Sequence, residues 1–141
     1  MSNDPADQKT ILVDLRGCQV NAERGIPAYA QSLVHHLAEH HLKHRFLWMV
    51  DPRRPMPTRQ EQLCRLGRVR TERDLSSDRS LQVDVLLSTS LFLPPDTKGP
   101  PELLPVWQRP HAPIRLGVVY DLIPYLFPDH YLVRETERAS F

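Results

Sequence analysis

Short runs of branched aliphatic residues alternate along this chain with segments of helical periodicity, and this alternation limits the fold more than any other feature. Each run is rich in Val, Ile and Leu and is followed by polar or turn residues, a pattern typical of strands. The predicted strands are Thr10–Leu15, Arg45–Val50, Val83–Ser90 and Leu116–Val119, with a weak edge strand around Val69. Because the run over 116–119 is apolar on both faces, it predicts a buried strand of a parallel sheet.

Three segments between and after these strands predict helices. The first begins at Gly25-Ile26-Pro27, because a proline in the first helical turn costs no hydrogen bond, and it ends near His41 or Leu42. A polar loop over residues 16–24 leads into it. A short helix is predicted over residues 58–66, and a last one from Asp129 toward Phe141. Strands that alternate with helices indicate an α/β fold with a parallel sheet and right-handed crossovers.

Composition narrows the class of protein. With 141 residues the chain is long enough for one domain with a real core, and its net charge of +1 gives no case for a nucleic-acid partner. Cys18 and Cys64 are too few and too far apart for a disulfide framework, so two free thiols in a reducing compartment are expected. We expect residues 1–8 to be a disordered polar N-terminus and residues 9–141 to form the single domain.

The N-terminus and the apolar runs also indicate a location. The first nine residues are polar and acidic, unlike a signal peptide, and the longest apolar runs are far too short to span a bilayer. A cytoplasmic protein is therefore expected. The fourteen prolines concentrate in two stretches, Pro52–Pro57 and Pro94–Pro113, which are predicted to connect elements rather than belong to them.

Polar side chains follow several of the predicted strands at the point where each strand ends. They are Asp14 and Arg16, Asp51, Ser88-Thr89-Ser90, and Tyr120-Asp121. In a parallel sheet these ends share one edge, which is where open α/β sheets bind ligands. Residues that leave a buried strand are often polar simply because they meet solvent or cap the next helix. The pattern alone leaves a polar ligand site and ordinary strand ends equally open.

Three segments together carry a resemblance to a known family. The first pairs Asp14-Leu15-Arg16-Gly17 with Glu23-Arg24-Gly25-Ile26-Pro27-Ala28-Tyr29. The second is Val83–Pro94. The third and most specific is a strand that ends in Tyr120-Asp121 and continues through Leu122-Ile123-Pro124 to Phe127-Pro128-Asp129-His130-Tyr131. They resemble the N-terminal domain of bacterial GT-B fold glycosyltransferases of the mannosyltransferase type, in which a second glycine and an arginine stand where this chain has Pro27 and Ala28.

The resemblance implies a Rossmann-like domain that forms the acceptor-side half of a GT-B enzyme. Such an enzyme transfers a sugar from a nucleotide-sugar donor to a glycan or lipid-linked acceptor, here in bacterial surface-polysaccharide synthesis. The donor is expected to bind mainly a C-terminal domain that this sequence does not contain, so the chain alone would be incomplete for catalysis. No further cofactor is implied for this half.

The same resemblance implies substrate-binding roles but no catalytic residue. The residues concerned are Arg16, Arg24, Gly25, Ser88, Ser90, Tyr120 and Asp121. Arg24 and Gly25 would face the donor diphosphate. A phenol such as that of Tyr120 can donate a hydrogen bond to a sugar hydroxyl or phosphate but is a poor general base near neutral pH. Asp121 either binds an acceptor hydroxyl or caps the turn that follows it.

Other features carry weaker hypotheses. His36, His40 and His44 stand four residues apart, but a solvated helix face explains them better than zinc, so no metal is predicted. Arginines between residues 65 and 79 are interleaved with acidic residues, which favours a salt-bridged surface. Weak peripheral contact with an anionic inner-membrane surface would suit a lipid-linked acceptor. A receiver domain is rejected because only Asp14 follows the first strand, whereas a stand-alone ligand-binding or protein-interaction module stays open.

Overall fold

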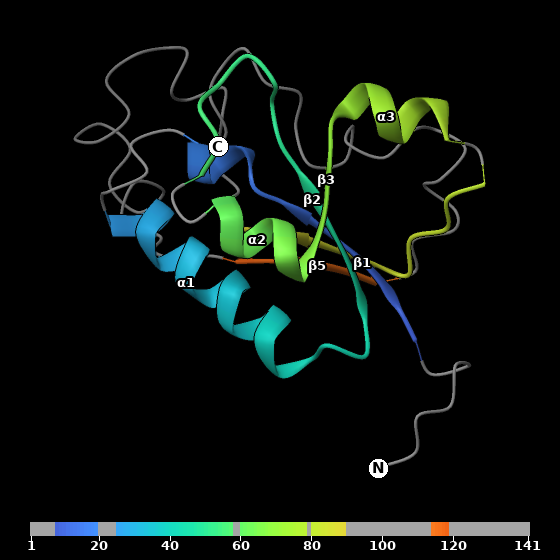
Figure 1. Cartoon of the computed structure of the whole chain (residues 1–141), viewed down its shortest axis with the longest axis horizontal. Coiled ribbons are helices and arrows are strands. Elements are labelled where there is room, and N and C mark those ends of the chain that lie inside the picture. The colour runs from blue at the N-terminus through green and yellow to red at the C-terminus, as the bar shows by residue number, and fades with distance from the viewer. Residues whose placement is uncertain (1–7, 20–24, 58–59, 79, 90–113, 119–141) are drawn as a thin grey trace, which may run out of the picture.

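The computed structural model describes residues 8–19, 25–57, 60–78, 80–89 and 114–118 (Figure 1). Within them, five parallel strands form one sheet in the order β3-β2-β1-β4-β5. The strands are β1 Thr10–Asp14, β2 Arg45–Met49, β3 Gly67–Arg70, β4 Val85–Ser88 and β5 Ile114–Gly117. The predicted α/β class with a Rossmann-like parallel sheet is therefore confirmed.

Helices connect these strands in the described part of the chain. They are the 3-10 turn η2 Arg16–Gln19 and the α-helices α1 Gly25–His40, α2 Gln60–Leu66 and α3 Glu72–Ser77. The prediction placed α1 and α2 correctly and missed α3. That helix is short, but Thr71 caps its first turn in a capping box with Asp74. None of the described helices has both the length and the apolar character needed to cross a membrane.

The helices lie on both faces of the sheet, and the alternation of strand side chains shows which helix covers which face. Val13 of β1 packs in one core cluster with residues of α1 and α2, whereas Leu12 packs in a second cluster with Leu75 of α3. Chain direction explains this division. The strands β1, β2 and β3 follow one another in one direction across the sheet and β4 lies back beyond β1, so right-handed crossovers place α3 on the opposite face.

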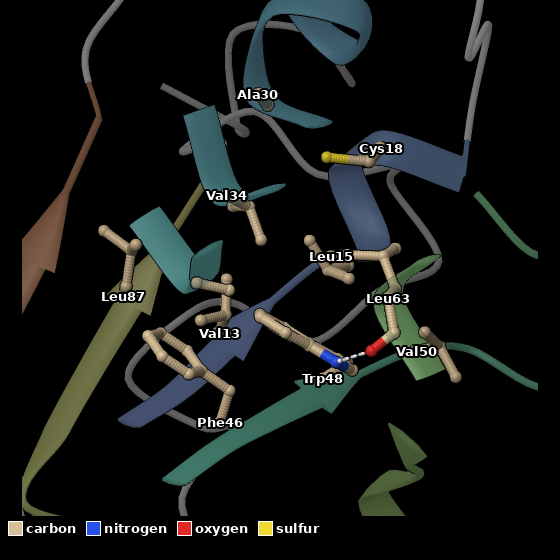
Figure 2. Packing of buried hydrophobic residues seen from close by; sticks show 11 residues of the cluster. Val13, Leu15, Cys18, Ala30, Val34, Phe46, Trp48, Val50, Leu63 and Leu87 are labelled. Carbon is tan, nitrogen blue, oxygen red and sulfur yellow. Dashed lines mark hydrogen bonds between the residues drawn. The ribbon is translucent and has the colours of Figure 1, made fainter. Parts of the chain in front are cut away.

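Trp48 is the largest fully buried side chain in the described part of the chain and organises the α1–α2 side of the core (Figure 2). Its indole Nε1–H donates to the carbonyl oxygen of Leu63 in α2 at 2.7 Å, so the buried donor is satisfied. Gly67 at the start of β3 is required by this packing. A Cβ there would lie 2.6 Å from Trp48 Nε1 and 2.7 Å from the backbone oxygen of Phe46.

Two sequence predictions need correction. The strand expected to be buried over 116–119 is β5, which runs over Ile114–Gly117 and is exposed along its whole length at the edge of the described sheet, beside β4. The expected polar loop over 16–24 begins instead with η2, in which Arg16, Cys18 and Gln19 are buried. The predictions for the N-terminus before residue 8 and for a helix from Asp129 lie outside the described residues.

Candidate functional site

A cleft of about 520 Å³ opens at the edge of the sheet where the strands end. Three segments form it: the start of η2, the turn after β2 and the first turns of α3. Its lining combines charged, hydroxyl and apolar groups from Arg16, Met49, Val50, Asp51, Pro52, Arg53, Thr71, Glu72, Arg73 and Ser76. The carboxyl edge of a parallel sheet, predicted to be polar, therefore carries a cleft.

Arg16 enters this cleft from a buried position. Its Nε lies 3.0 Å from Asp14 Oδ1 and its Nη2 lies 3.3 Å from Asp14 Oδ2, and both side chains are almost fully buried. The backbone N–H of Arg16 also donates to Asp14 Oδ1. Because β1 ends at Asp14 and η2 begins two residues later, this pair sets the direction in which the chain leaves the strand. The Arg16 guanidinium, whose charge the Asp14 carboxylate balances, is therefore held in a fixed position in the wall of the cleft.

Asp51 holds the opposite wall. Its carboxylate accepts from the backbone N–H of Arg53 at 2.9 Å and from the Arg53 guanidinium at 3.0 and 2.8 Å, while Arg54 Nε lies 3.4 Å away. The hydrogen bonds from the Arg53 side chain, together with the other contacts from Arg53 and Arg54, lower the pKa of Asp51 from 3.8 to about 2. Asp51 is therefore ionised at neutral pH and acts as a hydrogen-bond acceptor, not as an acid.

Gln19 connects the two walls. Its side-chain Nε2–H₂ donates to the carbonyl oxygens of Asp51 and Pro55, both at 3.0 Å, and its Oε1 accepts from the Asp51 N–H at 2.7 Å. Gln19 is itself buried. One amide side chain thus fixes the turn after β2 against the turn after β1, which gives the cleft a preformed shape.

The same 3-10 turn also contacts the end of β4. Thr89 Oγ1 donates to the carbonyl oxygen of Asp14 at 2.6 Å and lies 3.5 Å from Cys18 Sγ. Burial raises the pKa of the Cys18 thiol to about 11, since the lowering by Thr89 is smaller. Cys18 is therefore a packed, protonated thiol and not a nucleophile. Through Arg16, Cys18 and Gln19, η2 contacts the ends of β1, β4 and β2.

The first turn of α3 completes the cleft. Thr71 Oγ1 accepts from the Asp74 N–H at 3.2 Å, and the Thr71 N–H and hydroxyl both donate to Asp74 Oδ2. These hydrogen bonds lower the pKa of Asp74, the bond from the Thr71 backbone contributing most. Because this box orients the helix, Glu72, Arg73 and Ser76 line the cleft on the side away from η2.

The sequence named seven site residues, and the structure describes three of them. Arg16 lines the cleft. Ser88 is buried at the end of β4, in register with Asp14, and its carbonyl oxygen accepts from the Val118 N–H at 3.0 Å. Gly25 is the exposed first residue of α1, with φ of +38°. The structure therefore brings Arg16 and Ser88 to one edge. Arg24, Ser90, Tyr120 and Asp121 lie outside the described residues, so their roles stay predictions.

Sequence reasoning missed several residues that shape this cleft. Gln19 was placed in a polar loop, because a single glutamine carries no local signal of burial. Arg53 was also missed, although Asp-Pro-Arg after a strand is a pattern that favours an Asx turn. Arg73 was predicted only as part of a salt-bridged surface, and Thr71 was not singled out, although the spacing of Thr71 and Asp74 could have predicted the start of α3.

The histidines of α1 form pairs and no larger group. The rings of His36 and His40 meet edge to face with centroids 4.2 Å apart, and His35 Nδ1 lies 3.3 Å from Glu39 Oε2. Among the described residues, no three His, Cys, Asp or Glu side chains come together in a way that could hold a metal ion. The described chain therefore offers the cleft, rather than this helix, as its candidate site.

Comparisons of the chain with protein-family models, with curated proteins and with solved structures found no significant match. The chain is therefore described by its fold alone, an all-parallel, Rossmann-like α/β sheet with a polar cleft at its carboxyl edge.

Proposed function

We propose that this chain is the acceptor-side domain of a glycosyltransferase that uses a nucleotide-sugar donor. The observation that carries the proposal is the polar cleft at the carboxyl edge of the sheet, with guanidinium, carboxylate and hydroxyl groups around one opening. The fold agrees with this assignment, because α/β sheets of this kind bind ligands at that edge. The resemblance of residues 14–29, 83–94 and 118–131 to the GT-B family supplies the reaction class.

The chemistry of the lining suits a carbohydrate. Pairs of sugar hydroxyls are bound by planar groups that donate or accept two hydrogen bonds, and the exposed guanidinium of Arg73 in the lining is of this kind. Thr71 and Ser76 add hydroxyls, while Met49 and Pro52 add apolar surface for the C–H face of a pyranose ring. A cleft with this mixture binds a neutral or singly charged sugar more readily than an apolar molecule.

In this proposal, the cleft positions an acceptor glycan or the glycan part of a lipid-linked acceptor. The donor would occupy a second, C-terminal domain across the opening, as the resemblance implies. Catalysis would then depend on placing acceptor and donor together and on stabilising the departing diphosphate. The fixed positions of Arg16 and Asp51 would contribute by removing the need to reorganise the site when the acceptor binds.

Saturation-transfer NMR with a panel of mono- and oligosaccharides tests the acceptor site. We expect transfer to at least one glycan, lost in Arg73→Ala and retained in the matched control Arg65→Ala, whose arginine is exposed on α2 outside the cleft. Absence of saturation transfer to every glycan would refute a carbohydrate site in the cleft.

A second measurement separates a transferase from a binding module. The native gene product is incubated with labelled nucleotide sugars and the glycan that binds, and transfer is followed by mass spectrometry. A product heavier by one sugar residue supports the transferase. Binding without any transfer by that gene product would favour a stand-alone carbohydrate-binding module.

A further inference from the structure

A second, apolar depression lies at the opposite edge of the sheet, where the strands begin. This groove has a volume of about 240 Å³ and lies beside the C-terminal end of α1. Strand residues such as Phe46, Val85 and Leu116 form its floor, and His41 and His44 form its rim. The proposed acceptor site does not use it, because the amino and carboxyl edges are opposite ends of a parallel sheet (Figure 1).

Large hydrophobic side chains gather on the surface around this groove. Within the described residues four large hydrophobic side chains are exposed, and three of them belong to segments that form the groove: Leu116 at 53 % lines it, Ile114 at 49 % is in the same strand, and Leu42 at 69 % follows His41 in the chain. The register places Ile114 next to Val85 and Leu116 next to Leu87, both of which line the groove. Exposed apolar side chains that cluster in this way mark an interaction surface more often than scattered ones do.

Basic residues stand beside the residues that line this groove in the chain. Lys9, His44 and Arg45 are held together, since the Lys9 N–H donates to His44 Nδ1 and the Lys9 carbonyl oxygen accepts from the Arg45 N–H. Lys43 and His41 are exposed beside them, and the His41 and His44 rings stack with centroids 6.3 Å apart. We name this region the amino-edge patch: Leu42, Ile114 and Leu116 with the rim Lys9, His41, Lys43, His44 and Arg45.

The permanent charge of this end of the molecule is positive. Its cations are Lys9, Lys43 and Arg45, and its carboxylates are Glu39 beside His35 and Asp84, which accepts from the Thr10 N–H. Three cations against two carboxylates give +1, and all three cations are exposed.

We infer that the amino-edge patch is a membrane-docking surface that binds anionic phospholipid. Exposed leucine and isoleucine enter the boundary between headgroups and acyl chains, while lysine and arginine meet the phosphates. The rim fits such a surface because its charge is opposite to that of anionic headgroups. This inference does not depend on the proposed transferase function.

Vesicle flotation at low salt tests the inference. The probes are phosphatidylcholine vesicles with and without about 30 mol % phosphatidylglycerol, at neutral pH. We expect binding to the anionic vesicles only. Each cation near an anionic surface contributes roughly a fivefold gain in binding, so salt that screens the three permanent cations should weaken binding at least tenfold. No binding to the anionic vesicles, or equal binding to both vesicles, would overturn the inference.

Matched variants locate the surface. Leu42→Ser and Lys43→Gln should each weaken vesicle binding severalfold, whereas Tyr29→Ser and Arg65→Gln should not, because these exposed residues lie outside the patch. Vesicle binding that is unchanged in Leu42→Ser and Lys43→Gln would refute the patch as the docking surface. Light scattering examines the alternative occupant, a second copy of the chain. A dimer that Leu116→Ser converts to monomer would assign the patch to self-association and overturn the membrane proposal.

Discussion

The two edges of the sheet differ in which side chains they bury. At the carboxyl edge, polar groups are buried and paired: Asp14, Arg16, Gln19, Asp51 and Thr89 all have hydrogen-bond partners there. At the amino edge, large apolar groups of the described chain are exposed, Leu42 and Leu116 among them. Burial in this molecule therefore follows the availability of partners and not the polarity of the side chain alone.

The difference predicts where substitutions cost stability. A buried polar network is destabilised strongly when one member is removed, because the remaining group is left desolvated without its partner. An exposed apolar side chain contributes little to folding, so its removal is almost neutral. If substitutions at the two edges changed the free energy of unfolding equally, the contrast inferred from burial would be wrong.

The largest effect is expected for Arg16→Ala. Removing one partner of a buried ion pair leaves the Asp14 carboxylate uncompensated, which costs about 3–5 kcal/mol of unfolding free energy. Urea denaturation followed by the fluorescence of Trp48 and Trp107 measures this loss, with Arg65→Ala on the exposed side of α2 as control. Should Arg16→Ala abolish folding, the double variant Arg16→Met, Asp14→Leu recovers a folded protein, since it removes both charges. Equal stability of Arg16→Ala and wild type would contradict the buried pair.

Gln19→Leu should cause the next largest loss of unfolding free energy. It removes the hydrogen bonds that join Gln19 to Asp51 and Pro55 and leaves their backbone groups unsatisfied, at a cost of about 2–3 kcal/mol. Denaturation of Gln62→Leu, an exposed glutamine on α2, gives the matched control. If the two variants are equally stable, Gln19 does not fix the turn after β2.

Acid should weaken the contribution of Asp51. Its pKa is lowered to about 2 in the folded chain, so its stabilisation is fully present above the unfolded value of 3.8 and is lost as the pH falls toward 2. The difference in unfolding free energy between wild type and Asp51→Asn should be on the order of 2 kcal/mol at neutral pH. Denaturation series between about pH 7 and pH 2 measure it. A difference that stays constant over this range would show that the Asp51 charge is not stabilised by folding.

The two cysteines should differ in reactivity without a change in stability. Cys18 is buried with a pKa of about 11, whereas Cys64 is exposed on α2. Labelling of the native protein with an aromatic disulfide reagent at neutral pH should modify one thiol per chain, and peptide mapping should identify it as Cys64. Cys64→Ser should then show no rapid labelling. Fast modification of Cys18 would mean that the carboxyl edge opens readily.

Leu116→Ser should have the smallest effect on stability. The side chain is half exposed on β5, so its loss is expected to cost no more than about 0.5–1 kcal/mol. The same denaturation assay measures it, and Leu12→Ser in the fully buried centre of β1 provides the contrast. A loss as large as that of Arg16→Ala would show that β5 is covered in solution.

Much of the fold followed from local pattern. Branched aliphatic runs predicted the strands, and helical periodicity with Gly25 and Pro27 predicted α1 almost to the residue. Local patterns predict secondary structure well where the apolar side chains that pack against neighbouring segments recur with the period of the helix or strand. They missed η2 and α3, which are too short to show a period and depend on single hydrogen bonds such as those of Thr71 and Asp74.

The site was predicted only in its position. Because parallel strands bring their ends together, Asp14, Arg16, Asp51 and Ser88 could be placed at one edge from sequence alone. The cleft itself depends on contacts between residues far apart in the chain, such as Gln19 with Asp51 and Pro55, and on α3. No local spacing encodes such pairs.

The sequence by itself determined the secondary structure of the main elements, the parallel sheet and the edge at which its polar residues gather. These follow from the period of apolar side chains and from short-range backbone preferences, which act within a few residues. The tertiary structure decided which polar groups are buried and which apolar groups are exposed. Whether the cost of desolvating a polar group is offset by hydrogen-bond partners is decided only when distant segments meet. For this reason Arg16 and Gln19 became interior residues, while Leu116 remained at the surface.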